Sequence, residues 1–373
     1  MQMSRSSRSF RRPVSVLAGA VLLATVATGC GPTKAGSAES AVRDALDQLG
    51  AKEDATMIAE LDGTTDQVHS FLKENGHSLP GRSAVPTRKD ARLAARAQLT
   101  VSVGADKPLN EQRDASGTRL AAALNFGDRD VFAYKAIGKK IYIRVLLREL
   151  SSEKLLTKGD RRAVDDLRDL ADELPSSLKA AKSALRGKWV RISPDDFGDF
   201  AWAVRQLTGQ AGSGARARDA TSALDAGAQR DLLDKLGEVL RKDAVFKKAG
   251  AGKSGSDGDD DTEQLTATLP ARETAARLAP ALKPLGVDLR PSEVPDRDIT
   301  TQLTVRRGEL ADLSMDLGQL TGAKKSVHLP LRLTFSSGDA LSTEAPENPK
   351  KLDPQDVLAM VLYRSESSAD KKP

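Results

Sequence analysis

The 373-residue chain contains one cysteine, Cys30, and three histidines, and both scarcities restrict its chemistry. A single cysteine excludes an intramolecular disulfide and any zinc site built from several cysteines. No two of the histidines His69, His77 and His328 stand at the spacing of a metal-ligand pair. We therefore expect no bound metal, and we interpret each histidine as a structural or solvated residue.

Aromatic residues are also few, at 3% of the chain, although apolar residues as a whole make up 39%. The apolar share is large enough for a core, which must then be aliphatic and rich in alanine. The scarcity of aromatic rings argues against a surface on which sugars or nucleic-acid bases stack.

The N-terminus has the pattern of an export signal. Residues 1–12 contain four arginines and no acidic residue, and an apolar run at 14–28 follows. A basic segment, a short apolar run and small residues before a cleavage position are typical of a secretory signal peptide. The run is shorter than the ~20 residues that a membrane span requires. We therefore predict a signal peptide at residues 1–29.

The small residues Ala27, Thr28 and Gly29 directly precede Cys30, and this arrangement resembles a lipobox. The resemblance implies that Cys30 carries a diacylglycerol and becomes the new N-terminus. The lipid would anchor the protein to the outer, extracytoplasmic face of the cell membrane, with residues 30–38 as a tether. The alternative is an ordinary signal peptide with an unmodified cysteine, and the pair Arg11-Arg12 leaves the Sec and Tat export routes open.

Cleavage would change the charge balance. The whole chain has 57 basic and 52 acidic residues, and removal of four arginines leaves 53 against 52. The mature chain of 344 residues is then nearly neutral, so its composition gives no support for nucleic-acid binding, which needs a basic patch or stripe.

The first half of the mature chain alternates between strand and helix patterns. Apolar residues at helical spacing predict helices at 40–49, 65–75, 161–174, 177–185 and 229–246, and Ser193-Pro194 marks another helix start. Alternation predicts strands at 55–61, 97–103, 119–125, 131–137, 140–147 and 189–192. The strands together indicate an antiparallel meander followed by a helical segment.

Residues 247–263 are small and charged, and we expect a solvated loop there. A strand at 264–269 and a helix at 271–285 then repeat the order seen at 55–75, which suggests an internal repeat. Strands follow at 299–306, 310–317 (with Ala311 and Leu313 on one face) and 327–336, and Asp353-Pro354 caps a short helix. We assign a domain to 39–364, with halves 39–246 and 264–364, and a polar tail to 365–373.

Several short motifs match patterns for catalysis or nucleotide binding, but the surrounding sequence lacks the features that those sites require. Residues 250–255 match G-x-G-x-x-G and the end of a P-loop, but we expect the end of a charged helix before them in place of the required strand, and the acidic run 257–261 would repel phosphate. That run lacks the glycine and glutamate of a calcium loop, and two S-x-x-K matches lack a K-T-G partner. We expect no enzyme activity, no cofactor and no nucleotide.

Several segments together resemble the LprG/LppX-type lipoproteins, relatives of the periplasmic carrier LolA. They are Cys30, the strands at 141–147 and 189–192, and the hairpin 299–306/310–317 with its Arg307-Gly308 turn. The resemblance implies an α+β fold: a curved antiparallel β-sheet, shaped as a LolA/LppX-like half-barrel, with helices packed on one side and an apolar cavity for acyl chains.

Two functions remain open at this stage. The first is an anchored lipoprotein that binds or carries a lipid or lipoglycan, and the second is a non-enzymatic cell-envelope interaction or structural module with a solid core. For the first, the inward-facing aliphatic residues of the longest strands are the candidate cavity lining: Val101, Val103, Ile141, Ile143, Leu303, Val305, Leu313, Leu329, Leu331 and Leu333.

Overall fold

The computed structural model describes residues 37–75, 86–112, 117–127, 129–152, 156, 158–193, 196, 235, 238–239, 242–249, 262–283, 289–320 and 328–370. Cys30, His77 and most of the helical segments expected between 193 and 246 lie outside the described residues. Among the described residues, no helix is long and apolar enough to cross a membrane.

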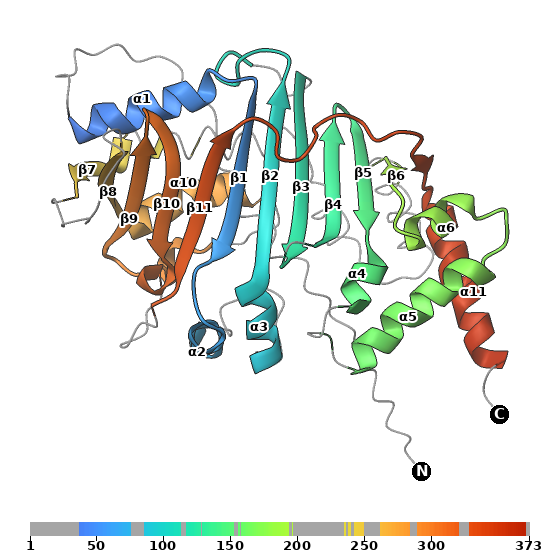
Figure 1. Ribbon diagram of the computed structural model, residues 1–373. Coiled ribbons are helices and arrows are strands. Elements are labelled where there is room, and N and C mark those ends of the chain that lie inside the picture. Colours follow the sequence, from blue (N-terminus) through green and yellow to red (C-terminus); the bar gives the residue numbers. More distant parts are fainter. Residues whose placement is uncertain are drawn as a thin grey trace.

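One sheet organises the described part of the chain, with strand order β12-β6-β5-β4-β3-β2-β1-β11-β10-β9-β8-β7 (Figure 1). The strands are β1 (Asp54–Leu61), β2 (Ala97–Ala105), β3 (Thr118–Phe126), β4 (Asp130–Ile137), β5 (Lys140–Val145), β6 (Val190–Ile192), β7 (Val245–Lys248), β8 (Thr262–Pro270), β9 (Asp298–Arg306), β10 (Glu309–Asp316), β11 (Pro330–Ser337) and β12 (Lys350–Lys351). All neighbours pair antiparallel except β12, which is parallel to β6. The sheet is curved and unclosed, so the expected fold class is confirmed, with one parallel pair at an edge.

Alternation of residue type gives this sheet one apolar and one polar face. On β1, Met57 faces the core whereas Thr56 and Glu60 face the opposite side. The hairpin between β9 and β10 turns at Arg307 and Gly308, which have φ of 53° and 76°. Two central residues with positive φ form the type I′ geometry that suits the twist of antiparallel strands.

The helices gather at three places around the sheet (Figure 1). In the described part of the chain they are α1 (Ala38–Gly50), α2 (Thr65–Asn75), α3 (Arg88–Arg96), α4 (Leu147–Ser152), α5 (Lys158–Glu173), α6 (Lys179–Leu185), α10 (Ala271–Leu282) and α11 (Pro354–Asp370), together with the short 3-10 turns η4 (Pro291–Glu293) and η5 (Leu317–Leu320). Helices α1 and α10 pack against the apolar face. Helices α2 and α3 contact each other beside β1, and α4, α5, α6 and α11 lie toward the β6 end.

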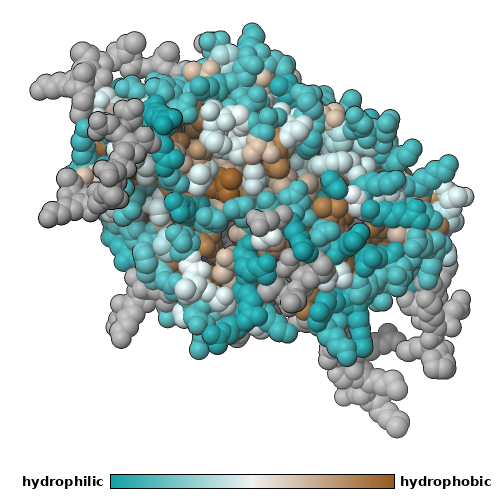
Figure 2. Space-filling model, in the orientation of Figure 1, coloured by the Kyte–Doolittle hydropathy of each residue, from teal (hydrophilic) through white to brown (hydrophobic). Residues whose placement is uncertain are grey.

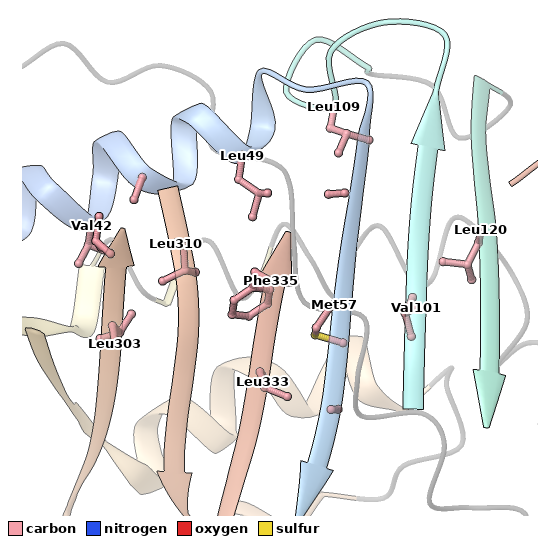
Figure 3. Close-up of a cluster of buried hydrophobic side chains, with 14 of the residues drawn as sticks. Val42, Leu49, Met57, Val101, Leu109, Leu120, Leu303, Leu310, Leu333 and Phe335 are labelled. Atoms are coloured by element: carbon pink, nitrogen blue, oxygen red, sulfur yellow. The ribbon is translucent and has the colours of Figure 1, made fainter. Parts of the chain in front are cut away.

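The largest core cluster lies between α1 and the apolar face of the sheet (Figure 3). Val42 and Leu49 of α1 are 2% and 1% exposed, and they join Leu303 and Leu310 from β9 and β10. Strands from both halves of the chain contribute to this cluster, because β1 pairs with β11. Burial of such side chains is the main source of stability, at about 1.5–3 kcal/mol for each.

Three expectations need correction at the level of single residues. Val245 and Phe246 form part of β7 rather than the end of a helix, since their backbone pairs with Thr268 and Ala267 of β8. Lys247 and Lys248 continue this strand, so the loop expected at 247–263 begins later. A β-branched residue next to an aromatic suits a strand, and that preference outweighed the helical periodicity.

On β10, the residue that faces the core differs from the one expected. A bulge between Leu310 and Asp312 inserts one extra residue into the pairing with β9. Leu310 is therefore 3% exposed in the core, whereas the expected core-facing Ala311 is only half-buried. An extra residue reverses the alternation on one side of a bulge, which local periodicity does not predict. The third correction is the length of α11, which continues to Asp370 through most of the expected polar tail.

Candidate ligand-binding face

The apolar face of the sheet consists of rows of side chains that run across neighbouring strands. One row follows the register from Leu303 through Leu313, Leu333 and Ala59 to Leu99. It continues through three further strands by the pairs Leu99–Leu124, Leu124–Phe132 and Phe132–Val145. Residues directly opposite on antiparallel strands stand about 5 Å apart, so the row forms an unbroken apolar strip across the sheet.

Nine of the ten candidate lining residues belong to this face and pack in or against the main core cluster. The exception is Leu329, which precedes β11 and packs with Val68 and Ala91 of α2 and α3 in a separate cluster. Leu329 lies outside β11, because that strand begins only at Pro330. The ten candidates therefore do not line one continuous surface.

The candidates also differ in how completely the protein covers them. Val101, Ile141, Leu303, Val305 and Leu333 are 3–4% exposed and packed as core residues. Val103, Ile143, Leu313 and Leu331 are half-buried. A half-buried aliphatic side chain retains apolar surface that a ligand could cover, which a fully packed core residue does not.

Sequence reasoning missed the longest run of half-buried apolar residues. Leu99, Leu124, Phe132 and Val145 are all half-buried, and they occupy successive strands β2 to β5 in one row. Alternation did place Leu99 and Leu124 on apolar faces, but it did not show that they share a row. A second half-buried group joins Met315, Leu331 and Leu61 across β10, β11 and β1.

The charged groups near this face form local pairs. His328 Nδ1 lies 2.8 Å from Asp316 Oδ2, and Asp316 Oδ1 accepts hydrogen bonds of 2.9 Å from the backbone N–H groups of Leu329 and Gly318. Burial alone would raise the pKa of Asp316, but the hydrogen bonds from His328, Leu329 and Gly318 outweigh it and lower that pKa. Asp316 thus joins the end of β10 to the start of β11. Among the described residues, no group of histidine and carboxylate side chains is arranged to hold a metal ion.

The surface in the view of Figure 1 is mainly hydrophilic, with smaller hydrophobic patches between its charged residues (Figure 2). The polar face of β8, β9 and β10 carries threonine, glutamine and serine in place of aliphatic residues. On these three strands the aliphatic residues therefore lie mainly on one face, the face on which α1 and α10 pack.

No protein-family model matches the chain, and no curated protein matches it. Among solved structures, the chain is similar to the lipoprotein LppX of Mycobacterium tuberculosis, with 10% identity and a TM-score of 0.34 over 82% of this chain and 98% of that one. It is also similar to LprF of Mycobacterium bovis, with 12% identity and a TM-score of 0.36 over 83% of this chain and 99% of that one. The resemblance to LprG/LppX-type lipoproteins that the sequence suggested is thus also found between structures.

Proposed function

We propose that the protein is a membrane-anchored extracytoplasmic lipoprotein that binds an apolar ligand, a lipid or lipoglycan, on the apolar face of its sheet. The anchor in this proposal is a diacylglycerol on Cys30, supported by the signal sequence that ends at the only cysteine of the chain. Thioether attachment would also remove a thiol that is exposed to oxidation outside the cytoplasm.

One observation carries the binding part of the proposal: the half-buried row Leu99, Leu124, Phe132 and Val145. Each of these side chains retains apolar surface that the described part of the protein leaves exposed, although each lies on the core face of a strand. Four successive strands about 4.8 Å apart give the row a length of about 14 Å. An acyl chain laid along the row would remove this surface from water at a gain of about 25 cal/mol per Å².

A second function is supported by a different surface. Helix α11 exposes Leu358, Val361 and Leu362, which stand at the i, i+3, i+4 spacing of a single helix face and are 43%, 55% and 53% exposed. Adjacent exposed aliphatic residues are typical of contact sites between proteins. This patch, with the closely packed Val101, Ile141 and Leu333, favours an interaction module with a solid core.

Native mass spectrometry of the mature chain, with alanine at position 30, distinguishes the two functions. A lipid carrier is expected to retain a co-purified lipid and to take up a fluorescent fatty acid after that lipid is removed. A single ligand-free mass together with no uptake of the fatty acid would contradict the carrier and support the interaction module.

A further inference from the structure

Residues 338–349, here called the strap, connect β11 in the middle of the sheet with β12 at its edge. Figure 1 shows this orange-red segment crossing the upper part of the strands that lie between. The strap is held at its start by the N–H of Gly338, which donates to the carbonyl of Asp54 at 3.1 Å. Immediately beyond its end, the N–H of Leu352 donates to the carbonyl of Arg191 at 2.8 Å. The strap thus connects β1 with β6 in addition to the hydrogen bonds between neighbouring strands of the sheet.

A buried pair of hydroxyl groups fixes the strap to β1 and β2. Thr56 and Ser102 are 1% and 0% exposed, and their oxygens lie 2.8 Å apart. Thr56 Oγ1 lies 2.7 Å from the carbonyl of Gly338 and accepts the N–H of Ala340 at 3.0 Å, whereas Ser102 Oγ accepts the N–H of Leu341 at 3.0 Å. A hydroxyl has one proton to donate.

The protons can therefore be assigned. Thr56 donates to the carbonyl of Gly338, which leaves Ser102 as the donor to Thr56. Each hydroxyl then uses its single proton and also accepts one N–H of the strap. The network is complete without water, and a buried polar network in which every member is satisfied holds its parts in one arrangement.

Further contacts fix the strap farther along the sheet. Lys135 Nζ of β4 donates to the carbonyl of Glu344 at 2.8 Å and lies 5.4 Å from the centre of the Trp189 ring. Thr343 of the strap is 2% exposed and lies over β2, so closely that a Cβ added to Gly104 would stand 2.6 Å from its hydroxyl oxygen. The strap is therefore seated on β1, β2 and β4.

The same strands carry the candidate ligand-binding face on their other side. Thr56 is followed by Met57, and Ser102 lies between Val101 and Val103, all three of which belong to the apolar face. Because side chains alternate along a strand, a contact on the polar face sets the position of the apolar side chains behind it.

We propose that the strap is a latch that sets the relative position of β1 to β6, and with it the shape of the apolar face available to a ligand. This inference rests on the proposed function, because the effect of the latch is expressed in ligand binding. Release of the latch would let the β2–β5 part of the sheet shift relative to β11 and β1. This shift would move the two half-buried groups of the apolar face apart.

Two variants release the strap without touching the apolar face. Ser102→Ala removes the acceptor of the Leu341 N–H, and Gly104→Ala places a methyl group against the side chains of Thr343 in the strap and of Asp54, whose carbonyl binds the start of the strap. Thr334→Val is the matched control: it removes a hydroxyl from the same face, one that donates to Asp312 at 3.0 Å and is not part of the hydrogen-bond network of Thr56 and Ser102. Two measurements are made on the mature chain with alanine at position 30: hydrogen exchange of the strap amides, and the dissociation constant of a fluorescent fatty acid.

We expect both latch variants to speed exchange at Ala340 and Leu341 by about tenfold, the factor that corresponds to one lost hydrogen bond in a buried network. We expect a loss of affinity of about fivefold or more, from part of that same free energy, with neither change in Thr334→Val. Faster exchange with unchanged affinity would overturn the latch and leave the proposed function intact. Absence of fatty-acid binding by the unmodified chain would overturn both. Gly104→Ala provides the test if Ser102→Ala does not fold.

Discussion

Leu331 on β11 lies directly opposite Met315 on β10, and both side chains are half-buried. Two residues farther along β11, Leu333 points to the same face but is only 3% exposed. These two leucines therefore provide a matched comparison within one strand between a partly open position and a packed one.

Leu333→Ala is expected to lower the free energy of unfolding by about 2–5 kcal/mol, the usual cost of a cavity in a packed core. Leu331→Ala is expected to cost less, because its side chain has fewer neighbours to lose. Leu331→Trp should fold and reduce uptake of a fluorescent fatty acid if a ligand occupies this position. Denaturant unfolding and probe titration measure the two effects, and Arg332→Ala on the opposite face is the control. Equal, severe destabilisation by both alanine variants would indicate a solid core.

Replacement of Cys30 by alanine is expected to move the protein out of the membrane fraction, because the proposed site of lipid attachment is lost. The measurement is cell fractionation combined with metabolic labelling by a palmitate analogue. Ser37→Ala is the matched control, since Ser37 lies outside the lipobox and caps α1 through the N–H of Ser40. Labelled protein that stays in the membrane fraction after Cys30→Ala would refute the anchor.

We expect Asp316 to make the folded protein less stable in acid than at neutral pH. Burial opposes the change, but the hydrogen bonds from His328, Leu329 and Gly318 lower the pKa of Asp316 below its value in the unfolded chain. A lowered carboxyl pKa contributes stability above the unfolded pKa of about 4, and this stability is lost as the pH falls through the folded value.

Asp316→Asn should therefore cost about 1.5–3 kcal/mol at pH 7, the range for hydrogen bonds to a charged group, and progressively less as the pH falls below about 4. Unfolding curves of both chains from pH 7 to pH 2.5 test this. A difference that does not change with pH would show that the carboxylate charge does not stabilise the β10–β11 junction.

Asp54 lies at the start of the strap, and we expect its contribution to stability to depend on pH in the opposite direction. Burial, followed by the charge of Asp339, raises the pKa of Asp54, with smaller contributions from Glu53 and Glu344 and an opposing one from Arg119. A raised carboxyl pKa favours the folded state at low pH, and this contribution is lost as the pH rises through the folded pKa.

Asp54→Asn is therefore expected to stabilise the protein at pH 7 and to have little effect at pH 3, where the carboxyl is protonated in both states. The measurement is the difference in unfolding free energy between the two chains at each pH. Destabilisation at pH 7 would show that the charge of Asp54 is held by Arg119 rather than opposed by the acidic side chains of the strap.

The sequence alone determined most of the elements and the two faces of most strands, although it predicted neither α3 nor α4. Strict alternation in 97–103 and 299–306 predicted β2 and β9 to within about two residues, because side chains on a strand point to opposite faces with a period of two. The Arg307-Gly308 turn was also predicted correctly, since it directly joins two alternating segments. Export and lipidation were likewise predicted from the first thirty residues, which carry their pattern in linear order.

Only the tertiary structure decided which strands are neighbours. β1 pairs with β11, at least 270 residues away in the sequence, and this pairing brings Leu61 opposite Leu331. Local periodicity carries no information about such pairings, because any two apolar faces can pack against each other. The half-buried row on β2 to β5, the bulge at Ala311 and the burial of Thr56 against Ser102 follow from register and from what covers each residue. These are properties of the assembled sheet, and the candidate binding face and its strap arise from them.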